Sequence, residues 1–137
     1  MGAFLYNNIV SNPTSYFVYM TTLATSNWYD KFKGDHNIYY PNADTGSKFY
    51  CRVTGGASPY PCNFTLWKSR LSAGSVDVNS LTSDPKFVSG SPTQATDFQL
   101  DVGSPAIDAG EDVGLSYDFG GNVVSDTTPN IGAWENR

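Results

Sequence analysis

Charged side chains are scarce in this chain, and long apolar runs are missing. Aspartate, glutamate, lysine and arginine together make up 15% of its 137 residues. The eight basic residues are outnumbered by 13 acidic ones and form no patch, so a nucleic-acid partner is not expected. No apolar run approaches the ~18 residues of a membrane-spanning helix. The start, MGAFLYNNIV, has neither the basic region nor the apolar stretch of a signal peptide.

Histidine is nearly absent, which narrows the routes to catalysis. His36 is the only one, and the G-x-S-x-G motif of many serine nucleophiles does not occur. Proton abstraction from a uronate needs a lysine or arginine near cation-binding carboxylates, and both types occur at Asp30, Lys31, Lys33 and Asp35. Without catalysis, His36 would be an exposed turn residue, and the residues from Asp30 to Asp35 would form a solvated strand face. We expect a non-catalytic protein.

Cysteine is limited to Cys51 and Cys62, which bracket the Gly- and Pro-rich segment RVTGGASPYP. Two thiols cannot supply the four ligands of a structural zinc site. A disulfide would staple this excursion and stabilise the fold by about 3 kcal/mol. Such a bond places the protein in an extracellular or periplasmic setting. Two unpaired thiols are the alternative.

Aromatic and small polar residues are abundant, which is typical of a β-rich, turn-rich chain. Residues 3–10, 16–23, 37–40 and 49–53 read as strands. Apolar residues at 64, 67 and 71 fit the spacing of a short helix.

A faint repeat links two of these segments. Asn8-Ile9-Val10 and Asn37-Ile38-Tyr39 lie 29 residues apart, and each has an asparagine before an apolar pair. A period of this length is typical of solenoids. Asparagine suits their corners because it tolerates left-handed backbone and its amide can bond to the next asparagine.

The last third of the chain carries a resemblance. The segments DFQLDVGSPAIDAG and PNIGAWE, within residues 97–135, and the preceding SLTSDPKFV, residues 80–88, resemble the C-terminal end of bacterial right-handed parallel β-helix proteins, the pectate-lyase-like superfamily. The resemblance covers residues 80–137 and implies an all-β, right-handed single-stranded parallel β-helix with few coils and a C-terminal cap. It carries no catalytic residue over to this chain. Proteins that this chain resembles have a short helix with a tryptophan where Trp67 lies, so we expect a helix over about 65–72.

This fold predicts one domain over residues 1–137, with coils over 1–96, a Cys-bracketed loop at 51–62 and a cap over 97–137. A jelly roll or sandwich is the alternative. Within the cap we expect Ser104 to start a helical turn, residues 131–134 to form a strand, and Ile107 and Trp134 to be structural. The expected inward side chains are Ile9, Phe17, Leu23, Ile38, Phe49, Leu81, Phe87, Leu100, Ile107 and Ile131.

Two sets of side chains are candidates for ligand binding. Exposed aromatic rings can stack on sugars, and the candidates are Trp28, Tyr29, Tyr39, Tyr40, Tyr50 and Tyr60. Residues 97–137 carry eight acidic residues and one arginine, a net charge of −7. Their densest cluster is a weak Ca²⁺ candidate, the alternative being a role in solubility alone: Asp108, Glu111, Asp112 and Asp118.

These observations favour a non-catalytic, extracellular module that contacts or binds polysaccharide. The alternatives are a C-terminal fragment of a polysaccharide lyase or glycoside hydrolase, and a structural module that self-assembles. Because the N-terminal coil begins with apolar residues and no cap, a homo-oligomer is expected around Phe4, Leu5 and Ile9.

Overall fold

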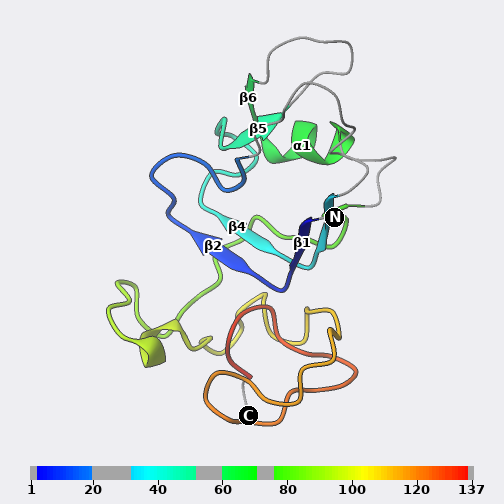
Figure 1. The fold of residues 1–137 in the computed structure, drawn as a ribbon. Helices are drawn as coiled ribbons and strands as arrows, with labels where there is room; N and C mark the ends of the chain where they lie inside the picture. Colours follow the sequence, from blue (N-terminus) through cyan, green and yellow to red (C-terminus); the bar gives the residue numbers. More distant parts are fainter. Residues whose placement is uncertain (1–2, 20–31, 52–59, 71–75, 136–137) are drawn as a thin grey trace.

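The computed structural model describes residues 3–19, 32–51, 60–70 and 76–135 (Figure 1). Along the chain, these residues form the strands β1 (Ala3–Tyr6), β2 (Ile9–Ser11), β3 (Phe32–Asp35), β4 (Ile38–Tyr40), β5 (Phe49–Cys51) and β6 (Tyr60–Cys62), the helix α1 (Phe64–Arg70) and the 3₁₀ helix η3 (Ala95–Phe98). Neither helix in these ranges is long and apolar enough to cross a membrane.

The strands pair in three separate two-stranded sheets. Strands β1 and β3 are parallel, as are β2 and β4, whereas β5 and β6 are antiparallel. A parallel β-helix needs one sheet that coils through successive turns, and the described residues contain no closed or coiled sheet. The predicted right-handed parallel β-helix is therefore wrong. The alternative jelly roll also needs far larger sheets than these pairs.

The 29-residue repeat is nevertheless visible in the strand register. Ala3 lies opposite Phe32, and Ile9 lies opposite Ile38, so both parallel pairs share one offset. The Asn8 amide nitrogen donates to the side-chain oxygen of Asn37 at 3.2 Å, which confirms the predicted asparagine contact. The corner itself lies one residue earlier than expected: Asn7 and His36 adopt left-handed backbone, with φ of 56° and 52°.

Apolar side chains collect in two clusters. The larger one surrounds Trp67 and comprises Phe17, Phe32, Tyr39, Ala43, Phe49, Cys51, Cys62, Phe64, Trp67 and Val76. The smaller one comprises Ile38, Leu100, Ala106 and Ile131, with partly buried neighbours around it. Five of the expected inward residues are buried: Phe17, Ile38, Phe49, Leu100 and Ile131. Four are partly buried against the smaller cluster: Ile9, Leu81, Phe87 and Ile107. Leu23 lies outside the described residues.

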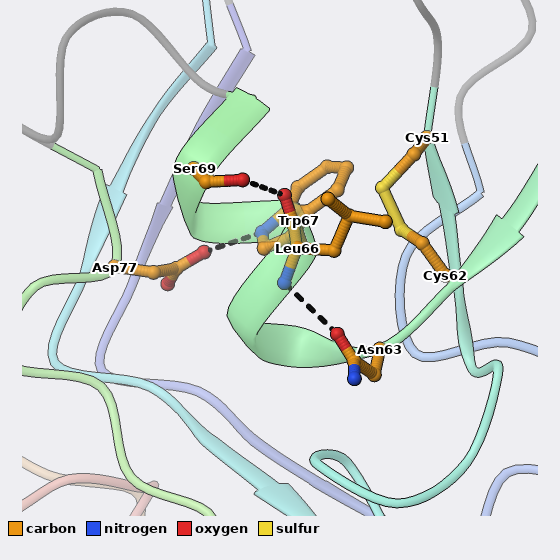
Figure 2. The surroundings of a disulfide bond; sticks show 7 residues. All are labelled: Cys51, Cys62, Asn63, Leu66, Trp67, Ser69 and Asp77. Carbon is orange, nitrogen blue, oxygen red and sulfur yellow. Dashed lines mark hydrogen bonds between the residues drawn. A yellow bond between two sulfur atoms is a disulfide. The ribbon is translucent and has the colours of Figure 1, made fainter.

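The Cys51–Cys62 disulfide links β5 to β6 beside helix α1 (Figure 2). Helix α1 confirms the short helix predicted over residues 65–72, although it begins at Phe64 and ends at Arg70. Asn63 caps it, because its side-chain oxygen accepts the N–H of Leu66 at 2.9 Å. Both sulfur-bearing residues are buried, at 0% and 3% exposure. The bond therefore belongs to the larger core and does more than staple a surface loop.

The segment 99–135 contains no regular helix, and the closing strand predicted over residues 131–134 is absent. Isolated bridges join Phe87 to Leu100 and Tyr117 to Val123. Ser104 caps a turn as expected: its hydroxyl accepts the N–H of Ala106 at 3.1 Å and donates to a carbonyl. Figure 1 shows this segment, yellow to red, wound into loops beside the strands. The glycine-rich sequence thus forms turns instead of regular elements.

Candidate functional site

Three adjoining hollows lie where the C-terminal loops meet β2 and β4. The first has a volume of about 330 Å³ and a mainly apolar lining that includes Ile9, Leu100 and Ile131. The second, of about 340 Å³, shares Trp134 with the first. The third, of about 510 Å³, shares Phe87 and Phe98 with the first. We call this row of hollows the aromatic groove; its rings are Tyr6, Tyr40, Phe87, Phe98, Tyr117, Phe119 and Trp134.

The central rings of the groove are held by a short antiparallel pairing. Val88 donates its N–H to the carbonyl of Gln99 at 2.9 Å, next to the Phe87–Leu100 bridge. This pairing sets the rings of Phe87 and Phe98 edge to face, with centroids 5.3 Å apart. The Phe98 side chain stays 45% exposed, so one face of the pair is open to a ligand.

The far end of the groove carries a second edge-to-face pair. Phe119 and Trp134 have ring centroids 5.5 Å apart, and Phe119 is 70% exposed. Trp134 is only half-buried, so it forms a wall of the groove and not a fully covered cap. Below the pair, partial burial raises the pKa of Asp118, but N–H donors of Asn122 and Glu135 outweigh burial and leave that pKa lowered.

The predicted aromatic residues fall into different environments. Tyr40 lines the third hollow, and the negative charge of Asp84 raises the pKa of its phenol. Tyr39 points the other way and is fully buried; burial, then the nearby Asp77, raises its pKa. Tyr39 is therefore unavailable to a ligand, contrary to the prediction that its ring binds sugar. The alternation along β4 explains the split, because adjacent residues face opposite sides.

Tyr50 belongs to a separate surface cluster. Its ring centroid lies 5.4 Å from that of Tyr16 and 4.5 Å from that of Tyr19. Burial, followed by its two tyrosine neighbours, raises the pKa of Tyr50. None of these three rings lines the groove. Tyr60 is the first residue of β6, and the candidates Trp28 and Tyr29 lie outside the described residues.

The predicted acidic cluster does not form a recognisable metal centre. Asp108, Glu111 and Asp112 are exposed, and Asp118 binds the N–H groups of the groove wall. Across residues 3–19, 32–51, 60–70 and 76–135, no group of three or more His, Cys, Asp or Glu could hold a metal ion. Calcium binding stays a prediction.

The residues considered for catalysis take other partners. Asp35 accepts the backbone N–H of Asn79 at 2.6 Å and its amide at 2.9 Å. His36 lies in a turn, as expected, but its ring is engaged: one nitrogen faces a carbonyl and the other the Glu111 carboxylate. Lys33 is exposed on β3, and Asp30 and Lys31 lie outside the described residues.

A buried carboxylate that sequence reasoning missed organises the larger core. Asp77 is fully buried, and its oxygens accept from the indole of Trp67 at 2.9 Å (Figure 2) and the hydroxyl of Ser80 at 2.7 Å. The Asn37 amide donates at 3.1 Å and the Tyr39 hydroxyl at 3.2 Å. These four donors are neutral. Because they hold the carboxylate away from solvent, we assign Asp77 a structural role.

No family model matches this chain, and neither a curated protein nor a solved structure matches it. The resemblance of residues 80–137 to the pectate-lyase-like superfamily therefore stays a prediction. The function proposed below is therefore based on the residues that line the aromatic groove.

Proposed function

We propose that the chain is a non-catalytic module that binds a neutral polysaccharide along the aromatic groove. The observation that carries the proposal is the row of rings. Tyr40 lies at one end, the Phe87–Phe98 pair in the middle, and the Phe119–Trp134 pair at the other end. A ligand made of repeated units can contact several rings in succession, which a compact small molecule cannot do.

The lining of the groove combines aromatic rings with polar side chains, and sugars need both. Sugar rings present C–H faces that pack on aromatic rings, and hydroxyls that need polar partners. Asp84, Lys86 and Ser89 lie beside the rings at one end. Glu111, Asp118 and Glu135 lie beside them at the other end. Apolar faces would provide the contact area, and these polar groups would set the orientation of the chain.

The charge of the groove favours a neutral glycan over a uronate polymer. Three carboxylates line the second hollow, and residues 97–137 have a net charge of −7. Lys86 is the only basic residue among the three linings, and it donates to the carbonyl of Gly103 at 3.1 Å. A polyanion would therefore meet repulsion at the second hollow.

The proposal predicts that Phe98→Ala weakens polysaccharide binding by about tenfold, equivalent to about 1.4 kcal/mol. The ring is 45% exposed and supplies one face of the central pair, so its loss removes contact area from the ligand. Affinity electrophoresis in gels that contain xyloglucan, mannan or polygalacturonate measures the change. We expect retardation by a neutral polymer and none by polygalacturonate.

Tyr19→Ala is the matched control for this experiment. Tyr19 is 54% exposed and also pairs with another ring, but it lies in the separate tyrosine cluster. Its removal should leave retardation unchanged. If Tyr19→Ala abolished retardation and Phe98→Ala did not, the tyrosine cluster would be the site and the groove assignment would be wrong. Release of sugar products during incubation would instead favour the lyase or glycosidase alternative.

Self-association is a second candidate, favoured by the exposure of Phe4. This side chain is 72% exposed on β1, and within the described residues β1 pairs only with β3. An apolar ring beside an open strand edge suits pairing with a second copy. Leu5 and Ile9, also expected at this interface, pack partly into the two cores.

We predict that Phe4→Lys shifts the protein toward a single 14.9 kDa species in sedimentation equilibrium at tens of micromolar. The lysine places a charge at the centre of the proposed contact, so each copy would repel the other. Val102→Lys is the control, because Val102 is 91% exposed and far along the chain from β1. A parent protein that sediments as a monomer would remove the proposal.

The disulfide is consistent with an extracellular or periplasmic location, which we include in the proposal. Disulfides persist in oxidising compartments and are rare in the cytosol. Cys51 and Cys62 are joined within the core, and the described residues contain no free cysteine. A polysaccharide ligand would also be encountered in such a setting.

A further inference from the structure

The His36 ring connects two distant parts of the chain. Its Nδ1 lies 2.7 Å from the carbonyl oxygen of Ala109, and its Nε2 lies 3.1 Å from a carboxylate oxygen of Glu111. A neutral imidazole has one N–H, whereas a carbonyl and a carboxylate both accept. Both contacts can be hydrogen bonds when the His36–Glu111 pair carries one extra proton, on the ring or on the carboxyl group. A neutral ring that faces an ionised Glu111 can complete only one of them.

Asn7 holds the same segment from the end of β1. Its side-chain oxygen accepts the Glu111 N–H at 2.8 Å, and its amide donates to the Glu111 carbonyl at 2.7 Å. We call Asn7, His36 and Glu111 the clasp. Asn7 and Glu111 also line the second hollow, so the clasp fixes one wall of the aromatic groove.

The wall beyond the clasp makes contacts within the C-terminal part. Gly114 donates to the side chain of Asp112 at 2.8 Å, and Val124 donates to the carbonyl of Ser116 at 3.1 Å. The side chains of Leu115 and Tyr117 are 63% and 65% exposed. Such a segment has little packing of its own, so its attachment through the clasp governs its position.

We propose that the clasp makes the aromatic groove responsive to pH. This inference rests on the proposed function, because it assigns a regulator to the same groove. When the pair loses its extra proton, one ring nitrogen presents a lone pair to an acceptor, and that contact becomes repulsive. The wall from Glu111 to Tyr117 then loosens, and the groove binds its polysaccharide more weakly.

The direction follows from the number of donors on the ring. Glu111 faces Nε2 at 3.1 Å, and the nearby Asp35 carboxylate accepts the His36 backbone N–H at 2.9 Å. A protonated ring donates to both of its acceptors, whereas a neutral ring has one N–H for the two. The closed wall is therefore present at low pH and is lost as pH rises through the range in which imidazoles discharge, between about pH 5 and 8.

A ligand-free NMR titration of the full chain tests the clasp. His36 is the only histidine, so one imidazole signal reports its protonation. We expect the backbone amide signals of residues 111–117 to shift with pH along the same curve as the imidazole signal. Amide signals that stay fixed while the imidazole titrates would overturn the inference.

Glu111→Gln gives the sharpest variant. A glutamine amide can donate to the lone pair on Nε2 while Nδ1–H donates to Ala109, so a neutral ring now completes the clasp. The wall should then stay closed at about pH 8, and its amide shifts should no longer follow the ring. Asp112→Asn is the control, because it removes a neighbouring carboxylate outside the clasp, and it should behave as the parent. A Glu111→Gln protein with the parent's pH response would defeat the proposal.

Binding to the neutral polymer that retards the parent separates the two ideas. We expect the parent to bind at least about fivefold more weakly at about pH 8 than at about pH 5.5, with Glu111→Gln nearly independent of pH. Binding that is equal at both values would sink the clasp but leave the proposed function standing. Amide shifts that follow the ring, in a protein that retains no affinity for any polymer, would sink the proposed function and leave the proton-sensitive clasp.

Discussion

Replacing Asp77 by alanine should lower the free energy of unfolding on the order of 4 kcal/mol. The carboxylate is fully buried and accepts hydrogen bonds from Asn37, Tyr39, Trp67 and Ser80. Removing it leaves these buried donors without an acceptor, and each unsatisfied donor costs about 1–3 kcal/mol. Relaxation of the hydroxyls recovers part of that sum. Urea unfolding followed by tryptophan fluorescence measures the change.

Two further variants define the cause. Asp77→Asn keeps the volume but turns an N–H toward the Trp67 indole, which can only donate, so we expect a loss of about 2–3 kcal/mol. Asp44→Ala removes an exposed carboxylate that accepts from Thr65 and Thr82, and it should cost less than about 1 kcal/mol. Equal losses for Asp44→Ala and Asp77→Ala would show that burial of the carboxylate is not what matters.

Local features of this structure could be predicted from the sequence. The Cys51–Cys62 pair and the helix near Trp67 both follow from short-range patterns. The repeat at Asn8 and Asn37 predicted segments that lie side by side and in register. Each of these predictions depends on residues close together, or on two matched segments, so local chemistry was sufficient.

The global fold could not be predicted in the same way. The C-terminal resemblance implied a coiled sheet, but residues 99–135 satisfy their backbone by turns and single bridges. Glycines within that segment permit turns that a strand pattern does not reveal. At Gly121, for example, φ is 83°, which an L side chain rarely adopts.

The groove and the buried carboxylate of Asp77 were missed because each is formed by residues that are distant in the sequence and meet only in the fold. Asp77 is an acidic residue in a polar stretch, which normally predicts exposure. Only the fold brings donors from β4, α1 and residue 80 to it. Of the two central groove rings, Phe87 was expected to point inward, and Phe98, which is 45% exposed, was not among the candidate rings. Tyr39 and Tyr40 were both candidates, and alternation along the strand did not say which ring faces outward; the structure shows Tyr39 buried and Tyr40 lining the groove.

Removing the disulfide should cost about 3 kcal/mol of unfolding free energy. The bond joins residues 11 apart in sequence, so it restricts the unfolded chain, and both cysteines are also buried in the larger core. The test is the double variant Cys51→Ala/Cys62→Ala, because a single substitution would leave a buried free thiol. Its urea midpoint should fall while the slope stays close to that of the parent, provided the unfolded chains remain comparable.

Reductant provides the control for this last prediction. Because the sulfurs lie in the core, dithiothreitol should attack the parent slowly under native conditions and rapidly in urea. The reduced parent should then unfold near the midpoint of the double variant, whereas the double variant should not respond to reductant. A double variant as stable as the oxidised parent would show that strand pairing between β5 and β6 already supplies the restraint. In that case the disulfide would contribute nothing to equilibrium stability.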